Sequence, residues 1–492
     1  MQNNRRWWAL AALMLSMLTI GFDATILNVA LPTLATALHA RTDGLQWIVD
    51  AYVLVFAGLL LPMGAIGDRY GRKRVILIGL ALFGGASVVA TYAAGTGTLI
   101  AARALMGIGA AILTPIGMAI LPVIFPPEER AKAISFAAIG MGAGVPLGPI
   151  IGGYLLRHFW WGSVFLVNVP VVVFALIAVA LLVPESKDPA PPRVDVVGGA
   201  LSTVGLVSFV YGVIEVPQRG WTDGLVLATL AAGITLLVAF VVWEKQTAQP
   251  MIDLDLFRKP RFLWGTVSAT VASFALFGLL FVVPQYLQAV RGNDALNTGL
   301  RLLPLMAGLI VGARVSVKLA TRIAISGGLG LMAAGLALGA ITTTSSGYGL
   351  AAAWLTIVGA GTGLALAPAM DAVLGELPPE RSGAGSALTQ AFRQVGGALG
   401  VALLGSLLAD AYQSRLTDTA PQAARDSVNG AVAVAGALHD PALLASAHSA
   451  YVHAMDTVLI SCAGVALLGA VLVAIFLPAR TARPTAELVT AV

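Results

Sequence analysis

The stretch Gly64-Ala65-Ile66-Gly67-Asp68-Arg69-Tyr70-Gly71-Arg72-Lys73-Arg74 separates two long apolar segments of the chain. It contains four basic residues, one acid and three glycines. Glycine allows a tight turn, and basic residues in short loops favour the cytoplasmic face of a membrane. The stretch therefore predicts a short, positively charged hinge between two membrane spans.

The composition places the whole chain in a membrane. Of its 492 residues, 58% are hydrophobic and 11% are charged, and the mean hydropathy is +0.88. A soluble protein of this length could not bury so much apolar surface. The apolar runs are continuous rather than alternating, which indicates helices and not a barrel. We therefore expect an all-α integral membrane protein.

Fourteen apolar runs are long enough to span a bilayer, which takes about 20 residues. The first run follows Arg5-Arg6, but it is too long for a signal peptide and contains Asp23, so we expect it to be retained. The expected spans are 8–34, 46–66, 74–94, 98–124, 133–156, 163–184, 195–216, 222–243, 262–289, 299–319, 325–344, 348–372, 385–409 and 455–478.

The basic residues set the orientation. With the amino terminus in the cytoplasm, cytoplasmic loops and helix ends carry 21 of the 29 Lys and Arg residues and external ones carry 7, with Arg103 inside a span. This is the asymmetry of the positive-inside rule. We expect both termini in the cytoplasm of a cell inner membrane. The cations are scattered over many loops, which argues against nucleic acid as a partner.

Two polar cytoplasmic breaks, at 185–194 and 244–261, divide the spans into six, two and six. The predicted domains are a six-helix bundle at 1–190, two inserted transmembrane helices at 191–250, and a second six-helix bundle at 251–492. Two six-helix bundles are a common transporter plan.

The second bundle includes a polar external segment at about 410–454, which we expect to fold as a helical hairpin over the outer face. Its histidines, His439, His448 and His453, fit no tight metal-ligand spacing, so we expect no metal site. The single cysteine, Cys462, can form no internal disulfide.

Asp23 and Arg103 are ionisable residues inside apolar spans, which makes them functional candidates. Both lie roughly two helical turns below the outer face, so an ion pair is possible. A nearby cation favours the charged carboxylate and burial favours the neutral acid. A conformational change could therefore switch Asp23 between the two forms, as proton coupling requires. The alternative is a static structural pair.

Two further acids are weaker candidates for proton coupling or substrate binding. Asp50 lies near the outer end of the second span, beside Trp47. It fits a proton or cation site and, equally, a solvated position at the rim of a vestibule. Asp371 lies near the inner end of the twelfth span, where it could simply reach the cytoplasmic surface.

The fifth span carries glycines at four-residue spacing, Gly140, Gly144, Gly148 and Gly152, together with Pro146 and Pro149. Such spacing leaves a bare helix face that a neighbouring helix can approach closely, and the prolines permit bending. Ordinary membrane-helix packing accounts for this pattern by itself. The stretch 144–153 also resembles the antiporter motif of facilitator-type exporters.

The spacing of the 64–74 stretch resembles the signature between the second and third helices of major facilitator transporters. We expect Asp68 near the start of the third helix, where a negative charge suits the helix dipole. The second half has only a degenerate copy at 318–322, so gating should be asymmetric. The alternative is that the cations serve as a topology signal alone.

Over essentially its full length the chain resembles the fourteen-helix drug:proton antiporters of the major facilitator superfamily. Further stretches that support this are 160–170, 284–288 and 393–400. The resemblance implies the major facilitator fold and alternating access. Trp161 stands where the family commonly has Arg.

Site residues follow from the same resemblance. It implies proton coupling through Asp23 and Arg103 and an interface between bundles near Gly148-Pro149. It also implies cytoplasmic gating by residues of the 64–74 stretch, namely Gly64, Asp68, Arg69, Gly71 and Arg72.

The expected function is proton-driven export of hydrophobic, commonly cationic, drugs or toxic compounds. The partners are then a small-molecule substrate, protons and the bilayer, with a single chain as the functional unit. The alternatives are a dedicated exporter of an endogenous metabolite or self-made antibiotic and, more remotely, a membrane sensor that transports nothing. No Gly-x-x-x-x-Gly-Lys-Ser/Thr, His-Glu-x-x-His or Gly-x-Ser-x-Gly stretch occurs, which argues against an ATPase or an intramembrane enzyme. We expect no cofactor.

The topology is testable with single cysteines placed in 185–194 and in 244–261, on a Cys462→Ala background. Both positions should react with a membrane-impermeant thiol reagent only from the cytoplasmic side, because an even number of spans separates them. Labelling from opposite sides would contradict the inserted helix pair.

Overall fold

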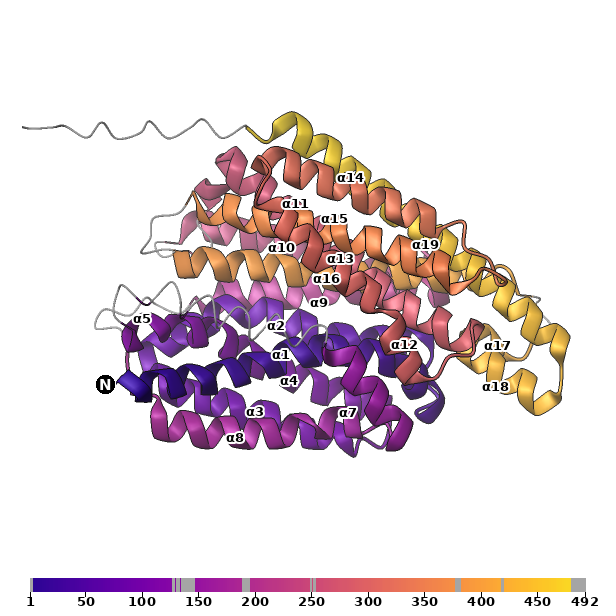
Figure 1. Ribbon diagram of the computed structural model, residues 1–492, viewed down its shortest axis with the longest axis horizontal. Coiled ribbons are helices and arrows are strands. Elements are labelled where there is room, and N and C mark those ends of the chain that lie inside the picture. The colour runs from indigo at the N-terminus through magenta and orange to yellow at the C-terminus, as the bar shows by residue number, and fades with distance from the viewer. Residues whose placement is uncertain are drawn as a thin grey trace, which may run out of the picture.

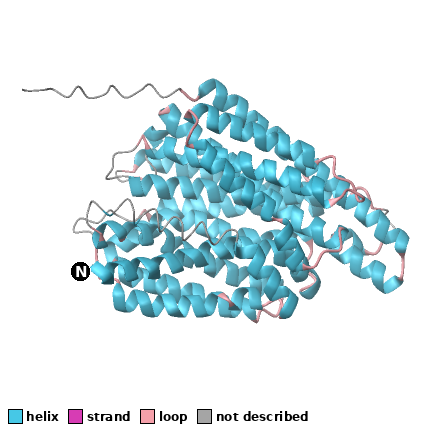
Figure 2. Cartoon of the chain, viewed as in Figure 1, coloured by secondary structure: helices cyan, strands magenta, loops and turns pink. Residues whose placement is uncertain are grey.

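A computed structural model describes residues 3–125, 129, 133, 147–187, 195–247, 250, 254–376, 382–416 and 420–478. Within these ranges the chain is helical and contains no strand, as Figure 2 shows. The expected all-α architecture is therefore confirmed.

The amino-terminal group of helices comprises α1 (Asn3–Ala37), α2 (Thr42–Tyr70), α3 (Arg72–Thr91), α4 (Thr96–Ala119), α5 (Leu121–Ile124), a helical segment at 147–158, α7 (Ser163–Leu166) and α8 (Asn168–Leu182). Two helices follow, α9 (Val196–Arg219) and α10 (Gly224–Gln246).

The carboxy-terminal group comprises η1 (Leu254–Arg258), α11 (Pro260–Gln285), the π-helical turn η2 (Tyr286–Val290), α12 (Ala295–Arg301), α13 (Leu303–Ser316), α14 (Thr321–Gly339), α15 (Tyr348–Leu374), α16 (Ser382–Gln413), α17 (Gln422–Asp426), α18 (Val428–Leu438) and α19 (Pro441–Phe476). We call the amino-terminal group the first half and this group the second half.

Thirteen helical stretches in the described part of the chain are long and apolar enough to cross a membrane. They correspond to thirteen of the fourteen expected spans. The remaining expected span, 133–156, lies largely outside the described residues, and only its end at 147–156 is seen as helix. The chain is thus a multi-pass membrane protein.

Aspartate side chains cap the amino-terminal ends of several of these helices. The carboxylate of Asp223 accepts hydrogen bonds from two backbone nitrogens at the start of α10, and Asp440 does the same for α19. Asp195 and Asp294 each accept one at the start of α9 and α12. A capping carboxylate satisfies amide groups that have no partner within the helix.

The two halves lie side by side, and the axes of their long helices are roughly aligned (Figure 1). α9 packs against α10, and also against α2 of the first half and α16 of the second. The predicted domain boundaries near 190 and 250 fall in or beside stretches outside the described residues. α9 therefore touches both halves.

The segment that we expect to be external, at about 410–454, forms helices at the end of the molecule opposite the amino terminus (Figure 1). α18 packs against the beginning of α19, which agrees with the expected hairpin. The last span differs from the prediction of 455–478, because α19 is one helix of 36 residues. At 1.5 Å per residue it is about 54 Å long, well beyond a hydrocarbon core of about 30 Å.

Candidate functional site

The structure brings Asp23 of α1 and Arg103 of α4 into an ion pair inside the first half. Nη1 of Arg103 lies 2.5 Å from Oδ2 of Asp23. Asp23 is 0% and Arg103 is 1% exposed. A buried pair of this kind is stable only when further contacts satisfy the remaining polar atoms.

Three other residues supply such contacts. Nε of Arg103 donates to the carbonyl of Ile48 on α2 at 3.1 Å, and Nδ2 of Asn168 on α8 lies 3.4 Å from Oδ1 of Asp23. The guanidinium carbon lies 4.3 Å from the centre of the buried Tyr52 ring, a cation–π distance. Four helices, α1, α2, α4 and α8, therefore meet at this pair.

Sequence reasoning did not single out Asn168 or Tyr52. The available signal was weak: Asn168 is an amide in an apolar span, and Tyr52 lies two residues after a candidate acid. An amide or a phenol is ordinary in a membrane helix. Only the rotation of α2 and α8 against α1 brings these side chains to the charges.

The structure does not place Asp50 and Asp371 at the ion pair. Asp50 is 0% exposed, so in this conformation it does not lie at a solvated rim. Neither of its carboxylate oxygens has a hydrogen-bond partner among the described residues. Asp371 is exposed near the end of α15, as its surface alternative requires.

The helical segment 147–158 packs on α1 around Asp23. A Cβ atom at Gly148 would lie 2.8 Å from the backbone nitrogen of Ile26, and one at Gly152 would lie 2.6 Å from the Ile26 side chain. The next residue, Gly153, faces the second half, since a Cβ there would lie 2.6 Å from the carbonyl oxygen of Ala295. This segment, which includes Pro149, thus touches both α1 and α12. Gly144 and Pro146 lie outside the described residues.

The 64–74 stretch is almost entirely helical, not a loop. α2 continues through Tyr70 and α3 begins at Arg72, so the turn is Gly71 alone, with φ of 108°. This left-handed backbone region favours glycine. Asp68 was expected near the start of the third helix and instead lies in the last turn of α2.

At that end of a helix a negative charge is unfavourable, and Arg72 compensates it. Nη2 of Arg72 lies 2.7 Å from Oδ1 of Asp68, across the Gly71 turn. Gly64 faces Pro115 of α4, whereas Arg69 is exposed.

Glu185, just after α8, caps the start of α3. Its carboxylate accepts hydrogen bonds from the backbone nitrogens of Lys73 at 3.1 Å and Arg74 at 3.3 Å. The backbone nitrogen of Arg72 donates to the carbonyl of Ser186 at 2.8 Å. The segment after the sixth span therefore closes around the predicted hinge, which the sequence did not indicate.

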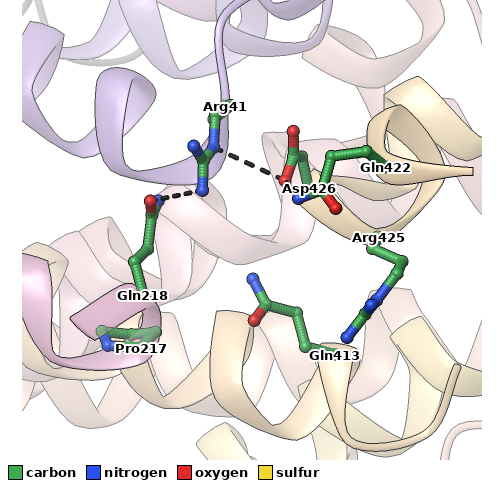
Figure 3. A pocket seen from close by; sticks show the side chains of 7 residues that line it. All are labelled: Arg41, Pro217, Gln218, Gln413, Gln422, Arg425 and Asp426. Atoms are coloured by element: carbon green, nitrogen blue, oxygen red, sulfur yellow. Dashed lines mark hydrogen bonds and ion pairs between the residues drawn. The ribbon is translucent and has the colours of Figure 1, made fainter. Parts of the chain in front are cut away.

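A polar cluster joins both halves and α9 (Figure 3). It includes residues of α17, which lies at the end opposite the amino terminus (Figure 1). Arg41, between α1 and α2, contacts Gln218 of α9 and lies 3.5 Å from Oδ1 of Asp426 on α17. Thr42 donates to the Asp426 carbonyl at 2.9 Å. Arg41, Gln218 and Asp426 border a cavity of about 340 Å³, which is also lined by Pro217, Gln413, Gln422 and Arg425. We call this group the distal cluster.

Other contacts between the halves lie toward the same end. Gln46, near the start of α2, donates to the carbonyls of Val401 and Ala402 on α16. Gln288 of η2 donates to the carbonyl of Val29 on α1 at 2.9 Å. Among the residues that the structure describes, no group of three His, Cys, Asp or Glu side chains could hold a metal ion.

Comparison with known proteins identifies the type of molecule. The model of the Major Facilitator Superfamily matches residues 13–401. The tetracenomycin C resistance and export protein of Streptomyces glaucescens is 32% identical and covers 98% of this chain and 93% of its own length. The multidrug efflux pump LfrA of Mycolicibacterium smegmatis is 36% identical, with 88% of each chain covered. The methyl viologen resistance protein SmvA of Salmonella typhimurium is 34% identical and covers 95% of this chain and 97% of its own.

Solved structures agree on the fold. A bacterial homologue of the human lysosomal transporter Spinster, in an inward-facing and unoccupied conformation, superposes with a TM-score of 0.70 at 17% identity, covering 97% of this chain and 98% of that one. The POT family transporter PepTSo superposes with a TM-score of 0.67 at 15% identity, covering 97% of this chain and 98% of that one. Relatives in sequence and in fold are thus transporters.

The capping role of Glu185 is testable. Glu185→Ala removes the acceptor for the first amides of α3, and loss of a helix cap costs about 1 kcal/mol. Amide hydrogen exchange at Lys73 and Arg74 should rise about fivefold, measured by mass spectrometry. Lys187→Ala, a change two residues away, serves as the control. Unchanged exchange in the Glu185 variant would show that its carboxylate does not hold this turn.

Proposed function

Because the chain belongs to the Major Facilitator Superfamily, we propose that it is a proton-coupled antiporter. It exports hydrophobic, commonly cationic, drugs or toxic compounds by alternating access. The buried Asp23–Arg103 pair carries this proposal, since ionisable groups at such depth are costly and mark ion pathways. The names of the relatives, which include resistance and efflux proteins, support the direction of transport.

In the conformation described here Asp23 accepts hydrogen bonds from Arg103 and Asn168. A proton can bind to Asp23 only when Arg103 moves away, because a neutral acid would leave the guanidinium buried without a counter-charge. Arg103 also contacts the Ile48 carbonyl and the Tyr52 ring of α2. A shift of α2 or α4 would therefore change the ion pair and the proton affinity together, which is the coupling that an antiporter needs.

Asp50 is the second proton carrier in this proposal. It lies on α2, the helix that holds Arg103 through Ile48, and it is buried without a polar partner among the described residues. An ionised carboxylate in such a place is costly. A proton, or a substrate cation reaching Asp50, would remove that cost.

Alternating access requires the two halves to separate at one end at a time. The distal cluster, the contacts of Gln46 and the Gln288–Val29 hydrogen bond all join the halves toward the end opposite the amino terminus. We propose that this is the external end, closed in this conformation. The Asp68–Arg72 turn, with Gly64, Arg69 and Gly71, then controls closure at the cytoplasmic end.

The orientation and the functional unit follow from the same plan. Both termini lie in the cytoplasm, in a cell inner membrane, and the bundles at 1–190 and 251–492 are joined by the helices of 191–250. One chain contains both halves, so a monomer suffices. No cofactor besides the coupling proton is needed.

Dedicated export of one endogenous metabolite or self-made antibiotic is the second candidate. The tetracenomycin C relative, whose name refers to a single compound, matches 98% of the chain. A panel of compounds in inside-out vesicles, with and without an imposed proton gradient, separates the two. Movement of one compound supports dedicated export, several support multidrug export, and none supports a sensor that transports nothing.

Asp23→Asn should abolish uphill export driven by a pH gradient, because the amide cannot bind a proton. We expect initial rates in proteoliposomes to fall at least about tenfold, equivalent to about 1.4 kcal/mol, while downhill exchange persists. Arg103→Ala should lose coupling as well, and Arg103→Lys should keep part of it, since Lys retains the charge without the planar fork.

The control for Asp23→Asn is Asp255→Asn, which makes the same change at an exposed acid and should leave export unaltered. Normal concentrative, proton-dependent export by Asp23→Asn would contradict the assignment and make Asp50 the next residue to test.

Arg41→Gln should loosen the external end. The ion pair with Asp426 is partly exposed, so we expect about 0.2–1 kcal/mol, or up to about a fivefold shift toward outward-open molecules. Spin labels at Ala37 and Leu438, on a Cys462→Ala background, report this equilibrium as a distance distribution. Arg219→Gln removes a neighbouring ion pair internal to α9, whose Arg is equally exposed at 44%, and should change nothing. An identical distribution for both variants would rule out a closing role for Arg41.

A further inference from the structure

Arg393 is an arginine of a membrane-spanning helix, α16 of the second half. Its Nε lies 3.4 Å from Oγ of Ser273 on α11, and its Nη1 donates to Oε1 of Gln390 at 3.2 Å. Ser273 is the fourteenth residue of the 31-residue span Pro260–Val290. Arg393 itself is the sixth residue of the 26-residue span Leu388–Gln413. The guanidinium therefore lies inside the helical bundle, between one end of the span and its middle.

Among the described residues this guanidinium has no carboxylate partner, whereas Arg103 has Asp23. Within the described part of the chain its recorded hydrogen bonds go to a hydroxyl and an amide, and none goes to a carboxylate. Both bonds are long compared with about 2.7–2.9 Å for charge-assisted pairs. A cation at this depth is costly without an anionic partner. Arg393 thus has unused capacity for an anion.

The surroundings of Arg393 suit an aromatic or amphiphilic molecule. Gly396, Gly397 and Gly400 of α16 allow α11 to approach closely, and a Cβ at Gly397 would lie 3.2 Å from the Phe277 ring. Phe274 and Phe277 are only partly buried. Arg393 is partly accessible as well, so apolar rings and a cation share this side of the α11–α16 pair.

The α11–α16 pair lies at the boundary between the halves and not on the outside of the molecule. α16 contacts α2 and α4 of the first half, and α11 contacts α1. In Figure 1, α16 runs through the middle of the molecule. A ligand beside Arg393 would therefore lie between the halves, where alternating access moves its cargo.

We propose that Arg393, supported by Gln390 and Ser273, binds the anionic group of an aromatic or amphiphilic ligand. This inference rests on the proposed export function and adds a charge class to it. The exporter accepts anionic as well as cationic molecules. Among the described residues Asp50 has no cationic partner and Arg393 has no anionic one, and the two lie in opposite halves. The same chemistry fits a lipid phosphate, which is the other possible source of the anion.

The test uses the full-length protein in nanodiscs without a proton gradient, and two dyes of opposite charge. Fluorescein is an aromatic anion and ethidium an aromatic cation, and fluorescence anisotropy gives each dissociation constant. Arg393→Gln should weaken fluorescein binding at least tenfold and change ethidium binding less than twofold. Arg393→Lys should fall between, because it keeps the charge but not the fork. Arg314→Gln, at an exposed arginine of α13, is the matched control.

The lipid composition separates the two sources of the anion. If phosphatidylglycerol competes with fluorescein in the wild type and phosphatidylcholine does not, the site also accepts a lipid phosphate. If neither lipid competes, the anion is that of the cargo. Both results support the proposal. Equal fluorescein affinity in wild type and Arg393→Gln, or no fluorescein binding by the wild type, overturns it.

Intact ethidium binding shows that Arg393→Gln is folded. If that variant does not fold, Ser273→Ala and Gln390→Ala together should still weaken fluorescein binding severalfold, and an unchanged affinity overturns the proposal. This test is independent of the proposed proton coupling. The coupling is tested by gradient-driven export of Asp23→Asn, whereas dye binding is measured without a gradient.

Discussion

The Asp23–Arg103 ion pair is the constraint around which the first half is arranged. Two charges far from water are tolerated only with close geometry and additional partners, and removing one partner of a buried pair costs about 3–5 kcal/mol. The 2.5 Å contact, the Ile48 carbonyl, the Asn168 amide and the Tyr52 ring meet that requirement together. These groups belong to α1, α2, α4 and α8, and a shift of any of these helices would weaken the ion pair.

The pair is linked to the second half by contiguous packing. The segment 147–158 lies on α1 within a turn of Asp23, at Gly148 and Gly152, and reaches Ala295 of α12 through Gly153. On another side of the first half, Gln46 of α2 bonds to α16. Contiguity of this kind is a physical route for coupling, although only a measured energy establishes coupling itself.

α9 complicates a simple rocking motion. It packs against α2 and α16, and Ser406 of α16 donates to the Val213 carbonyl of α9 at 3.0 Å. Gln218 at its end belongs to the distal cluster. α9 touches both halves. When the halves move relative to each other, α9 must therefore slide against α2, against α16, or against both.

The sequence by itself determined the membrane class, the approximate positions of most spans and the two charges at Asp23 and Arg103, because hydropathy and charge are local along the chain. It missed the early start of α19 at Pro441. The tertiary structure alone decided what each side chain meets. Asp68 lies at the end of α2, not at the start of α3 as expected. Glu185 caps the start of α3, and Asn168 and Tyr52 contact the ion pair. The tertiary structure leaves Arg393 without an acid at hydrogen-bonding distance among the described residues. Such partners depend on how each helix is rotated and how deeply it sits against its neighbours, which no periodicity along a single span records.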